Sequence, residues 1–481
     1  MSATVPKVEP ETEEIAAGND LPEGWASVPL PEAFEINPPK PPSGALASDK
    51  PVTFVPMPAV DAEAGAITKS ELRPFSKVRN GFTAFREGDV IFAKITPCME
   101  NGKAAIARNL LNGFGFGSTE FHVLRSRGAV LPEFIYHFVR RESFRRAAEA
   151  EMTGSVGQRR VPVDFLKQVE FPVAPLAEQE RIVAKIEELF TQVNATRAHL
   201  AKVAHILKRF RQAVLAAACS GRLTEEFRVE RHLPDWEYAP LEDAGMRIQI
   251  GPFGSLLHRH DYVENGIPLI NPMHIKVGKI IPSADFTVSS AKAKELTQYR
   301  LREGDVILGR RGEMGRAAVV REAADGYLCG TGSLFVRSID EQIDSDFLCF
   351  FLQSPQTKSN LEMNAVGSTM VNLNQRIVGE LEFPEADIHE QHEIVRRVEA
   401  LFKLADTIEK RVEAATKRAD KLTQAILAKA FRGELVPTEA ELARREGRDY
   451  APASEALARI KSKSGESKEG PSSTRKSRKR Y

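Results

Sequence analysis

Two pairs of polar, glycine-containing loops carry the side chains of this sequence with the clearest binding chemistry. They span residues 94–103 and 154–160 in the first half of the chain, and residues 310–316 and 367–376 in the second half. Basic and amide side chains in such turns donate to phosphate oxygens and to base edges of nucleic acids. A solvated turn is the alternative for any one loop taken alone. The candidate DNA-binding residues are Lys94, Asn101, Lys103, Gln158, Arg159, Arg160, Arg310, Arg311, Arg316, Asn372, Asn374 and Arg376.

Three further motifs resemble reactive sites, but each lacks a residue that the chemistry requires. Asn37-Pro38-Pro39-Lys40 resembles the amine-binding motif of amino-methyltransferases, with Lys40 in place of the aromatic residue that stacks on a flipped base. Gly113-Phe114-Gly115-Phe116-Gly117 has the wrong glycine spacing for a dinucleotide turn. His389 and His392 lie three residues apart, but no third or fourth metal ligand is evident. We therefore predict no catalytic residues and no metal site.

The composition predicts a soluble, cytoplasmic protein with several domains. Hydrophobic residues make up 42% and charged residues 28% of the 481 residues, and no apolar run reaches membrane-spanning length. The four cysteines form no CxxC pair, which favours a reducing compartment over disulfides or structural zinc. Because the net charge is only +1, a DNA-binding surface must concentrate its positive charge locally. Residues 461–481 are basic, and we expect a solvated tail there.

The chain is an internal repeat. Glu170-Phe171-Pro172 recurs as Glu382-Phe383-Pro384, at an offset of 212 residues (382 minus 170). The segment Arg-Glu-Gly-Asp-Val-Ile at residues 86–91 recurs at residues 302–307. Two repeats therefore span roughly residues 21–223 and 233–435. Residues 31–84 and 243–300 barely align, so the two repeats share a frame but differ in the segments that could recognise a ligand.

Each repeat ends in a helix of about 40 residues, on the order of 60 Å long. Apolar or small residues alternate in steps of four and three from Ile182 to Ala217 and from Ile394 to Ile426, which is the seam of a coiled coil. The other helix of the same chain is the favoured partner for this seam, and a homodimer or another protein is the alternative. Asp387 with Glu390 predicts a capping box at the start of the second helix. Gly221 and Gly433 predict left-handed stops at the helix ends.

The segments before these helices contain short apolar, β-branched runs between Gly, Pro and Asp residues, which predicts mostly antiparallel strands. Gly88 and Gly304 are expected to supply a positive φ before one strand of each repeat. The strands are expected at residues 89–95, 104–107, 121–124, 305–308, 317–320 and 334–336, and short helices at residues 132–150 and 346–363. The fold class is therefore α+β, with two mixed α/β domains and a pseudo-two-fold internal repeat.

In the order and duplication of its motifs, the sequence resembles the specificity (S) subunit of type I restriction-modification systems over residues 21–450. The motifs that carry this resemblance are Gly88-Asp89-Val90-Ile91, Ile95-Thr96-Pro97-Cys98, Glu100-Asn101-Gly102-Lys103, Gly251-Pro252-Phe253-Gly254-Ser255, Gly304-Asp305-Val306, Arg311-Gly312-Glu313, Glu178-Gln179, Ile182-Val183, Leu189-Phe190 and residues 430–437. The resemblance implies two target-recognition domains that are separated by two long antiparallel coiled-coil helices.

The expected domain boundaries combine the repeat with this resemblance. They are a disordered extension at residues 1–20, target-recognition domain 1 at 21–175, spacer helix 1 at 176–221, a linker at 222–232, target-recognition domain 2 at 233–387, spacer helix 2 at 388–433 and a C-terminal tail at 434–481. Residues at the helix starts are expected to serve helix initiation and partner binding. They are Glu178, Gln179, Glu390 and Gln391.

The resemblance also implies a non-catalytic subunit that reads an asymmetric bipartite target on double-stranded DNA. It implies as partners two methyltransferase (M) subunits and motor-nuclease (R) subunits, which would hold S-adenosylmethionine, ATP and Mg, so that this chain needs no cofactor. A coiled-coil scaffold that binds only proteins is the alternative function. A self-contained methyltransferase that uses Asn37 is a third hypothesis.

Overall fold

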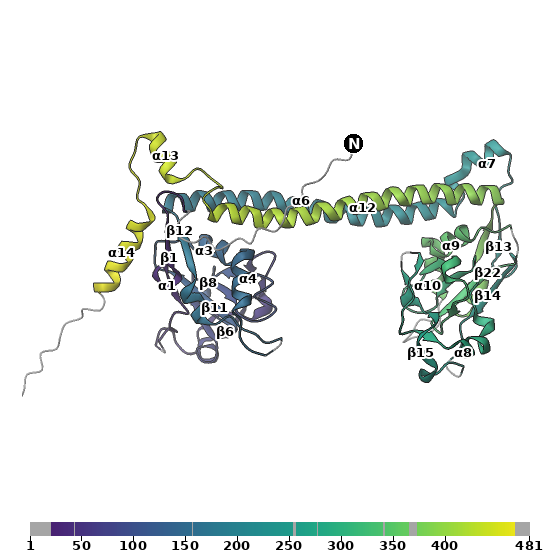
Figure 1. The fold of residues 1–481 in the computed structure, drawn as a ribbon, viewed down its shortest axis with the longest axis horizontal. Helices are drawn as coiled ribbons and strands as arrows, with labels where there is room; N and C mark the ends of the chain where they lie inside the picture. The colour runs from purple at the N-terminus through teal and green to yellow at the C-terminus, as the bar shows by residue number, and fades with distance from the viewer. Residues whose placement is uncertain are drawn as a thin grey trace, which may run out of the picture. The chain divides into compact units, whose positions relative to one another are not determined.

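The computed structural model describes residues 21–42, 44–155, 157–253, 256–276, 278–339, 342–364 and 373–466 (Figure 1). The chain divides into two compact units. Unit 1 comprises residues 1–198 and 416–481, and unit 2 comprises residues 199–415. Each long helix therefore contributes one part to each unit. The α+β class and the internal repeat that the sequence predicts are confirmed.

Unit 1 contains two four-stranded sheets, in the orders β2-β11-β8-β9 and β6-β3-β10-β7. The first sheet is antiparallel throughout, whereas β3 and β10 pair in parallel. The strands of unit 1 are β1 Ala26–Pro29, β2 Phe34–Ile36, β3 Pro51–Val55, β4 Val60–Asp61, β5 Ala66–Ile67, β6 Glu71–Pro74, β7 Thr83–Arg86, β8 Val90–Ala93, β9 Ala104–Ile106, β10 Phe114–Gly117, β11 Phe121–Ser126 and β12 Glu170–Val173. Its short helices are α1 Leu30–Ala33, α2 Phe75–Val78, α3 Pro132–Val139, α4 Glu142–Ala150 and α5 Val163–Gln168.

Unit 2 repeats the first of these sheets in the order β14-β22-β19-β20, again antiparallel. Its strands are β13 Glu237–Pro240, β14 Met246–Ile250, β15 Tyr262–Ile270, β16 Ile275–Lys276, β17 Lys279–Ile280, β18 Thr287–Val288, β19 Val306–Gly309, β20 Ala317–Val319, β21 Leu328–Cys329, β22 Ser333–Ser338 and β23 Glu382–Glu385. Its short helices are α7 Glu225–Arg231, α8 Ser290–Glu295, α9 Ser345–Gln353, α10 Pro355–Asn364 and α11 Gln375–Gly379. The glycines before β8 and β19 have φ of 81° and 86°, as the sequence predicts.

The long helices α6 Leu176–Ala218 and α12 Ile388–Phe431 pack against each other in each unit. In unit 1 Arg197 Nη2 lies 2.7 Å from Asp420 Oδ1, and in unit 2 Arg211 Nη2 lies 2.6 Å from Asp406 Oδ1. Because the residue numbers rise along one helix as they fall along the other, the pair is antiparallel. The predicted seam within one chain is confirmed. Its buried members are Ile182, Ile186, Val193, Leu207, Val214, Ile394, Val398, Ala405, Ala419 and Ile426.

Several local predictions differ from the structure. Each predicted short helix is two helices, and Pro355 marks the second break because its ring fits only the first turn of a new helix. The capping box is half formed: Asp387 accepts a bond from His389 N, but the Glu390 side chain points elsewhere. Within the C-terminal tail, α13 Glu439–Glu446 and α14 Ala453–Glu466 fold onto unit 1, with Leu457 in its core. Residues 1–20 and 467–481 lie outside the described residues.

Two functional classes can be checked against the described part of the chain. No helix there combines the length and hydrophobicity that crossing a bilayer requires. Among the described residues, no group of three or more Asp, Glu, His or Cys side chains is arranged to hold a metal ion. His389 and His392 therefore belong to no such group. Asn37 is tied into a turn, where its Oδ1 accepts a bond from Val123 N at 2.9 Å.

Candidate nucleic-acid interface

The two polar loops of the first repeat lie against each other at the end of β8 in unit 1. Val161 N donates to Lys94 O at 2.8 Å, and Thr96 N donates to Arg159 O at 3.0 Å. These backbone bonds join the segment 94–103 to the segment 158–161, which lie far apart in the sequence. The structure therefore brings both groups of candidate residues of the first repeat together.

The second repeat joins its two loops at the equivalent place, at the end of β19 in unit 2. Leu373 N donates to Arg310 O at 2.9 Å, and Arg310 Nε returns a bond to Leu373 O at 3.0 Å. Arg310 follows β19 as Lys94 follows β8. Most of the second loop, including the candidate Asn372, lies outside the described residues. The paired-loop arrangement is thus a feature of both repeats.

Acidic neighbours neutralise part of the positive charge on the loops of unit 1. Arg160 donates two hydrogen bonds of 2.9 Å to Glu120, and these bonds lower the pKa of the Glu120 carboxyl. Arg159 lies 3.9 Å from Glu149, and Lys103 Nζ donates to a backbone carbonyl. Asn101 and Gln158 are exposed, and Lys94 is half-buried. Glu120 is a member of this surface that no sequence spacing indicates.

The basic residues of unit 2 differ sharply in how accessible they are. Arg310 is only 5% exposed, and burial lowers the pKa of its guanidinium. Arg316 donates to Glu313 and to a backbone carbonyl, and the ion pair lowers the pKa of Glu313. Arg311 is exposed and makes no hydrogen bond or ion pair with the described residues. Arg311 is therefore the basic side chain of this loop that is most available to a ligand.

The remaining candidates of unit 2 lie at the start of α11. Asn374 is exposed, and its Oδ1 caps the helix by accepting a bond from Ile377 N at 2.9 Å. Arg376 is also exposed and forms an ion pair of 2.6 Å with Glu380, one turn further along the helix. Both side chains reach solvent, so both remain available for binding.

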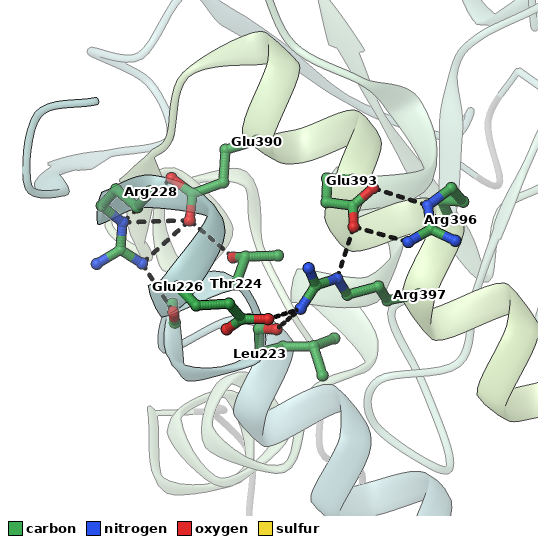
Figure 2. A network of polar contacts seen from close by, with 9 residues as sticks. Leu223, Thr224, Glu226, Arg228, Glu390, Glu393, Arg396 and Arg397 are labelled. Atoms are coloured by element: carbon green, nitrogen blue, oxygen red, sulfur yellow. Dashed lines mark hydrogen bonds and ion pairs between the residues drawn. The ribbon is translucent and has the colours of Figure 1, made fainter. Parts of the chain in front are cut away.

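A buried carboxylate fixes the start of each long helix. In unit 2 Glu390 accepts bonds from Thr224 Oγ1 at 2.7 Å and from Arg228 (Figure 2). It also accepts a bond from Trp236 Nε1 at 2.9 Å. We call Thr224, Arg228, Trp236 and Glu390 the unit 2 clasp. It ties the segment that follows α6 to the first turn of α12.

Unit 1 has an equivalent cluster at the start of α6. Glu178 accepts a bond from Trp25 Nε1 at 2.9 Å and one from Glu439 N at 2.8 Å. We call Trp25, Glu178 and Glu439 the unit 1 clasp. Burial raises the pKa of Glu178, and within the part of the chain that the structure describes no arginine donates to it as Arg228 donates to Glu390. In each unit, the segment that follows one long helix thus fixes the start of the other.

The adjacent glutamines are also occupied within the chain. Gln179 accepts a bond from Leu131 N at 2.9 Å, and Gln391 accepts one from Asp344 N at the same distance. The side-chain amide nitrogens of both glutamines donate to backbone carbonyls. Glu178, Gln179, Glu390 and Gln391 are at most 1% exposed. The prediction of partner binding for these four therefore finds no support in the geometry, which favours their predicted role at the helix start.

The chain thus contains two mixed α/β domains with paired polar loops, and each domain is followed by one helix of an antiparallel pair. This arrangement defines a class of proteins with two duplicated recognition domains. Residues 22–205 and 261–418 match the family model of the type I restriction modification DNA specificity domain. The chain belongs to this family.

Curated relatives and solved structures are consistent with that assignment. The chain is 34% identical to the type I restriction enzyme EcoBI specificity subunit of Escherichia coli over 59% of this chain and 62% of that protein. It is 33% identical to the StySPI specificity subunit of Salmonella potsdam over 65% of this chain and 67% of that protein. The first of these matches thus spans less than two thirds of the relative.

Among solved structures, the HsdS subunit from Thermoanaerobacter tengcongensis has a similar fold, with a TM-score of 0.56 and 22% identity. That comparison covers 86% of this chain and 98% of the other. A chain from a study of complex assembly and conformational transition of the type I R-M system gives a TM-score of 0.68 at 21% identity, over 86% of this chain and 99% of that one. Because the sequence identities are only 21% and 22%, these two structures show that the fold is shared and nothing further.

Proposed function

We propose that this chain is the non-catalytic DNA-recognition subunit of a type I restriction-modification complex. Each unit would read one part of an asymmetric bipartite target on double-stranded DNA through its paired loops. The chain would work in the cytoplasm and position two methyltransferase subunits and the motor-nuclease subunits. S-adenosylmethionine, ATP and Mg would bind to those partners, and this chain would need no cofactor of its own.

The pairing of polar loops at the same place in both repeats is the observation that carries this proposal. A coincidental solvated turn would not be expected to recur with the same backbone bonds, at Lys94 and Val161 in one unit and at Arg310 and Leu373 in the other. Donors that are held on a rigid frame suit the recognition of phosphates and base edges. Family membership supports the same conclusion.

Salt dependence of DNA binding tests the proposal. The full chain, assembled with its methyltransferase subunits, is titrated with mixed-sequence duplex at several salt concentrations. Neutralised phosphates release counterions, so log K should fall linearly with log salt, by about 0.9 for each phosphate contact. A chain that serves only as a protein scaffold would add nothing to the slope of the methyltransferase subunits alone. That result would contradict the proposal.

A further inference from the structure

Several chain segments meet at close range beside the 310–316 loop of unit 2, and glycines permit this approach. A Cβ atom at Gly251 would lie 2.0 Å from Gly330 O, and one at Gly330 would lie 2.4 Å from Asn271 Oδ1. A Cβ atom at Gly332 would lie 2.9 Å from the Pro272 ring. These distances leave no room for side chains, so the glycines fix how the segments cross.

Hydrogen bonds join the segments of this crossing and attach it to the candidate DNA-binding loop. Gly251 N donates to Ser333 O at 3.0 Å, and Gly332 N donates to Asn271 Oδ1 at 3.2 Å. Arg310 N in turn donates to Gly332 O at 3.0 Å. The backbone just before residue 253 is therefore fixed relative to the loop that carries Arg311.

From this crossing, two large apolar side chains project into solvent. Phe253 is 61% exposed, and Met273, which follows Pro272, is 56% exposed. All 26 phenylalanines of the chain lie within the described residues, and Phe253 alone among them is exposed. Single exposed apolar residues are ordinary on protein surfaces. Phe253 follows two residues after Gly251, and Arg311 follows directly after Arg310, so an exposed aromatic ring and an exposed arginine both extend from the same crossing.

We propose that Phe253 is a wedge that inserts between two base pairs of the DNA, with Met273 packing at the same step. Apolar side chains that enter a base step unstack it, and nearby positive charge holds the phosphates of the deformed duplex. We assign that charge to Arg311, which is exposed and directly follows Arg310 at the crossing. The proposal rests on the proposed function and adds to it a contact that reads how readily one step in the half-site of unit 2 deforms.

Fluorescence of 2-aminopurine tests the wedge directly. The target duplex is first identified by sequencing the methylated sites in cells that express the complex. The probe is then that duplex with 2-aminopurine placed at one step at a time, excluding the methylated bases and the steps next to them, because a base that is flipped out for methylation also unstacks its neighbours. The wild-type complex should raise the fluorescence at a single step of one half-site. Phe253→Ala should abolish the increase and weaken binding about tenfold, within the range of one lost base-stacking contact.

Two control variants separate insertion from a change in folding. Phe253→Trp keeps an aromatic wedge and should restore both the fluorescence and the affinity. Ile339→Ala removes another exposed apolar side chain, which is 73% exposed and lies at the opposite end of the sheet, just after β22. It should change neither readout. Because both native side chains are exposed, the melting temperatures should match that of the wild type.

The outcomes distinguish the wedge from the proposed function. If Phe253→Ala binds the target with unchanged affinity, or keeps the fluorescence increase, the wedge is overturned while DNA recognition stands. An affinity loss without any fluorescence increase in the wild-type complex also overturns insertion. If the wild-type complex does not prefer the target duplex over a mixed-sequence duplex, the proposed function itself fails.

Discussion

At the scale of single residues, accessibility divides the predicted basic side chains into two groups. Arg310 and Arg311 are adjacent in the sequence, and no pattern of charge or spacing separates them. The structure buries Arg310 against Leu373 and leaves Arg311 in solvent. The sequence could therefore predict where the binding loop lies, but not which of its arginines faces outward, because that depends on a contact with a residue 63 positions away.

This difference in exposure predicts that two neighbouring substitutions change different properties, DNA affinity in one case and stability in the other. Arg311→Ala should weaken binding to the target duplex by about 1–3 kcal/mol if the side chain contacts a base, with an unchanged melting temperature. Arg310→Ala should instead lower the melting temperature, because it removes a buried hydrogen bond that joins two loops. DNA titrations and thermal melts of both variants measure this. Unchanged affinity in Arg311→Ala would remove that residue from the interface.

The buried side chain of His137 should make the stability of unit 1 depend on pH. His137 is 5% exposed, and burial lowers its pKa to about 3. The unfolded chain takes up a proton near the ordinary value of about 6.5, whereas the folded chain does not. Stability should therefore fall as the pH drops from about 6.5 toward 3, by up to about 1.4 kcal/mol for each pH unit.

Replacing this histidine should flatten the pH dependence. His137→Leu should reduce the stability lost between pH 6.5 and pH 5 by up to about 2 kcal/mol, whatever its effect at neutral pH. Urea unfolding in a Trp236→Phe background reports on unit 1 through Trp25, because the chain has only two tryptophans. His260→Leu, at a side chain that is 82% exposed, is the control and should keep the wild-type slope. An unaltered slope in His137→Leu would contradict the explanation.

At the scale of elements, the sequence predicts what is periodic and misses what depends on long-range contacts. The seam from Ile182 to Ala217 follows from spacing alone, and so do the strands after Gly88 and Gly304. The capping box at Asp387 fails because Glu390 bonds to Trp236, 154 positions earlier. The positions of α13 and α14 could not be predicted from the sequence either, because both helices contact the first repeat: α13 through Glu439 N and Glu178, and α14 through the core of unit 1.

The unit 2 clasp makes a prediction about how the start of α12 is held. Glu390→Ala leaves Arg228 without its carboxylate at a site where that side chain is only 15% exposed. Removing one member of a buried ion pair costs about 3–5 kcal/mol. Urea unfolding, followed by Trp236 fluorescence in a Trp25→Phe background, measures this loss. Glu399→Ala changes an exposed carboxylate of the same helix and should stay within about 0.5 kcal/mol of the wild type. Equal stability of the two variants would contradict the clasp.

At the scale of the whole molecule, duplication is the central feature. The two repeats share a sheet order, a pair of joined loops and a clasp at each helix start. They differ in the segments 31–84 and 243–300. The segment after β14 carries the exposed Phe253, whereas the Asn-Pro-Pro-Lys segment after β2 in the first repeat contains no aromatic residue. A common frame with unlike surfaces is what independent reading of two unlike half-sites requires.

Methylome sequencing after exchange of one recognition domain shows whether the two units read their half-sites independently. Residues 21–173 are replaced by the equivalent segment of a family member with a different target, and the chain is expressed with its methyltransferase subunits. The junction lies at the end of β12, before the buried start of α6, so the clasp carboxylate Glu178 is retained. One half of the methylated sequence should change, and the other half should stay as in the wild type. A change in both halves, or in neither, from a folded and active complex would contradict independent reading by two units.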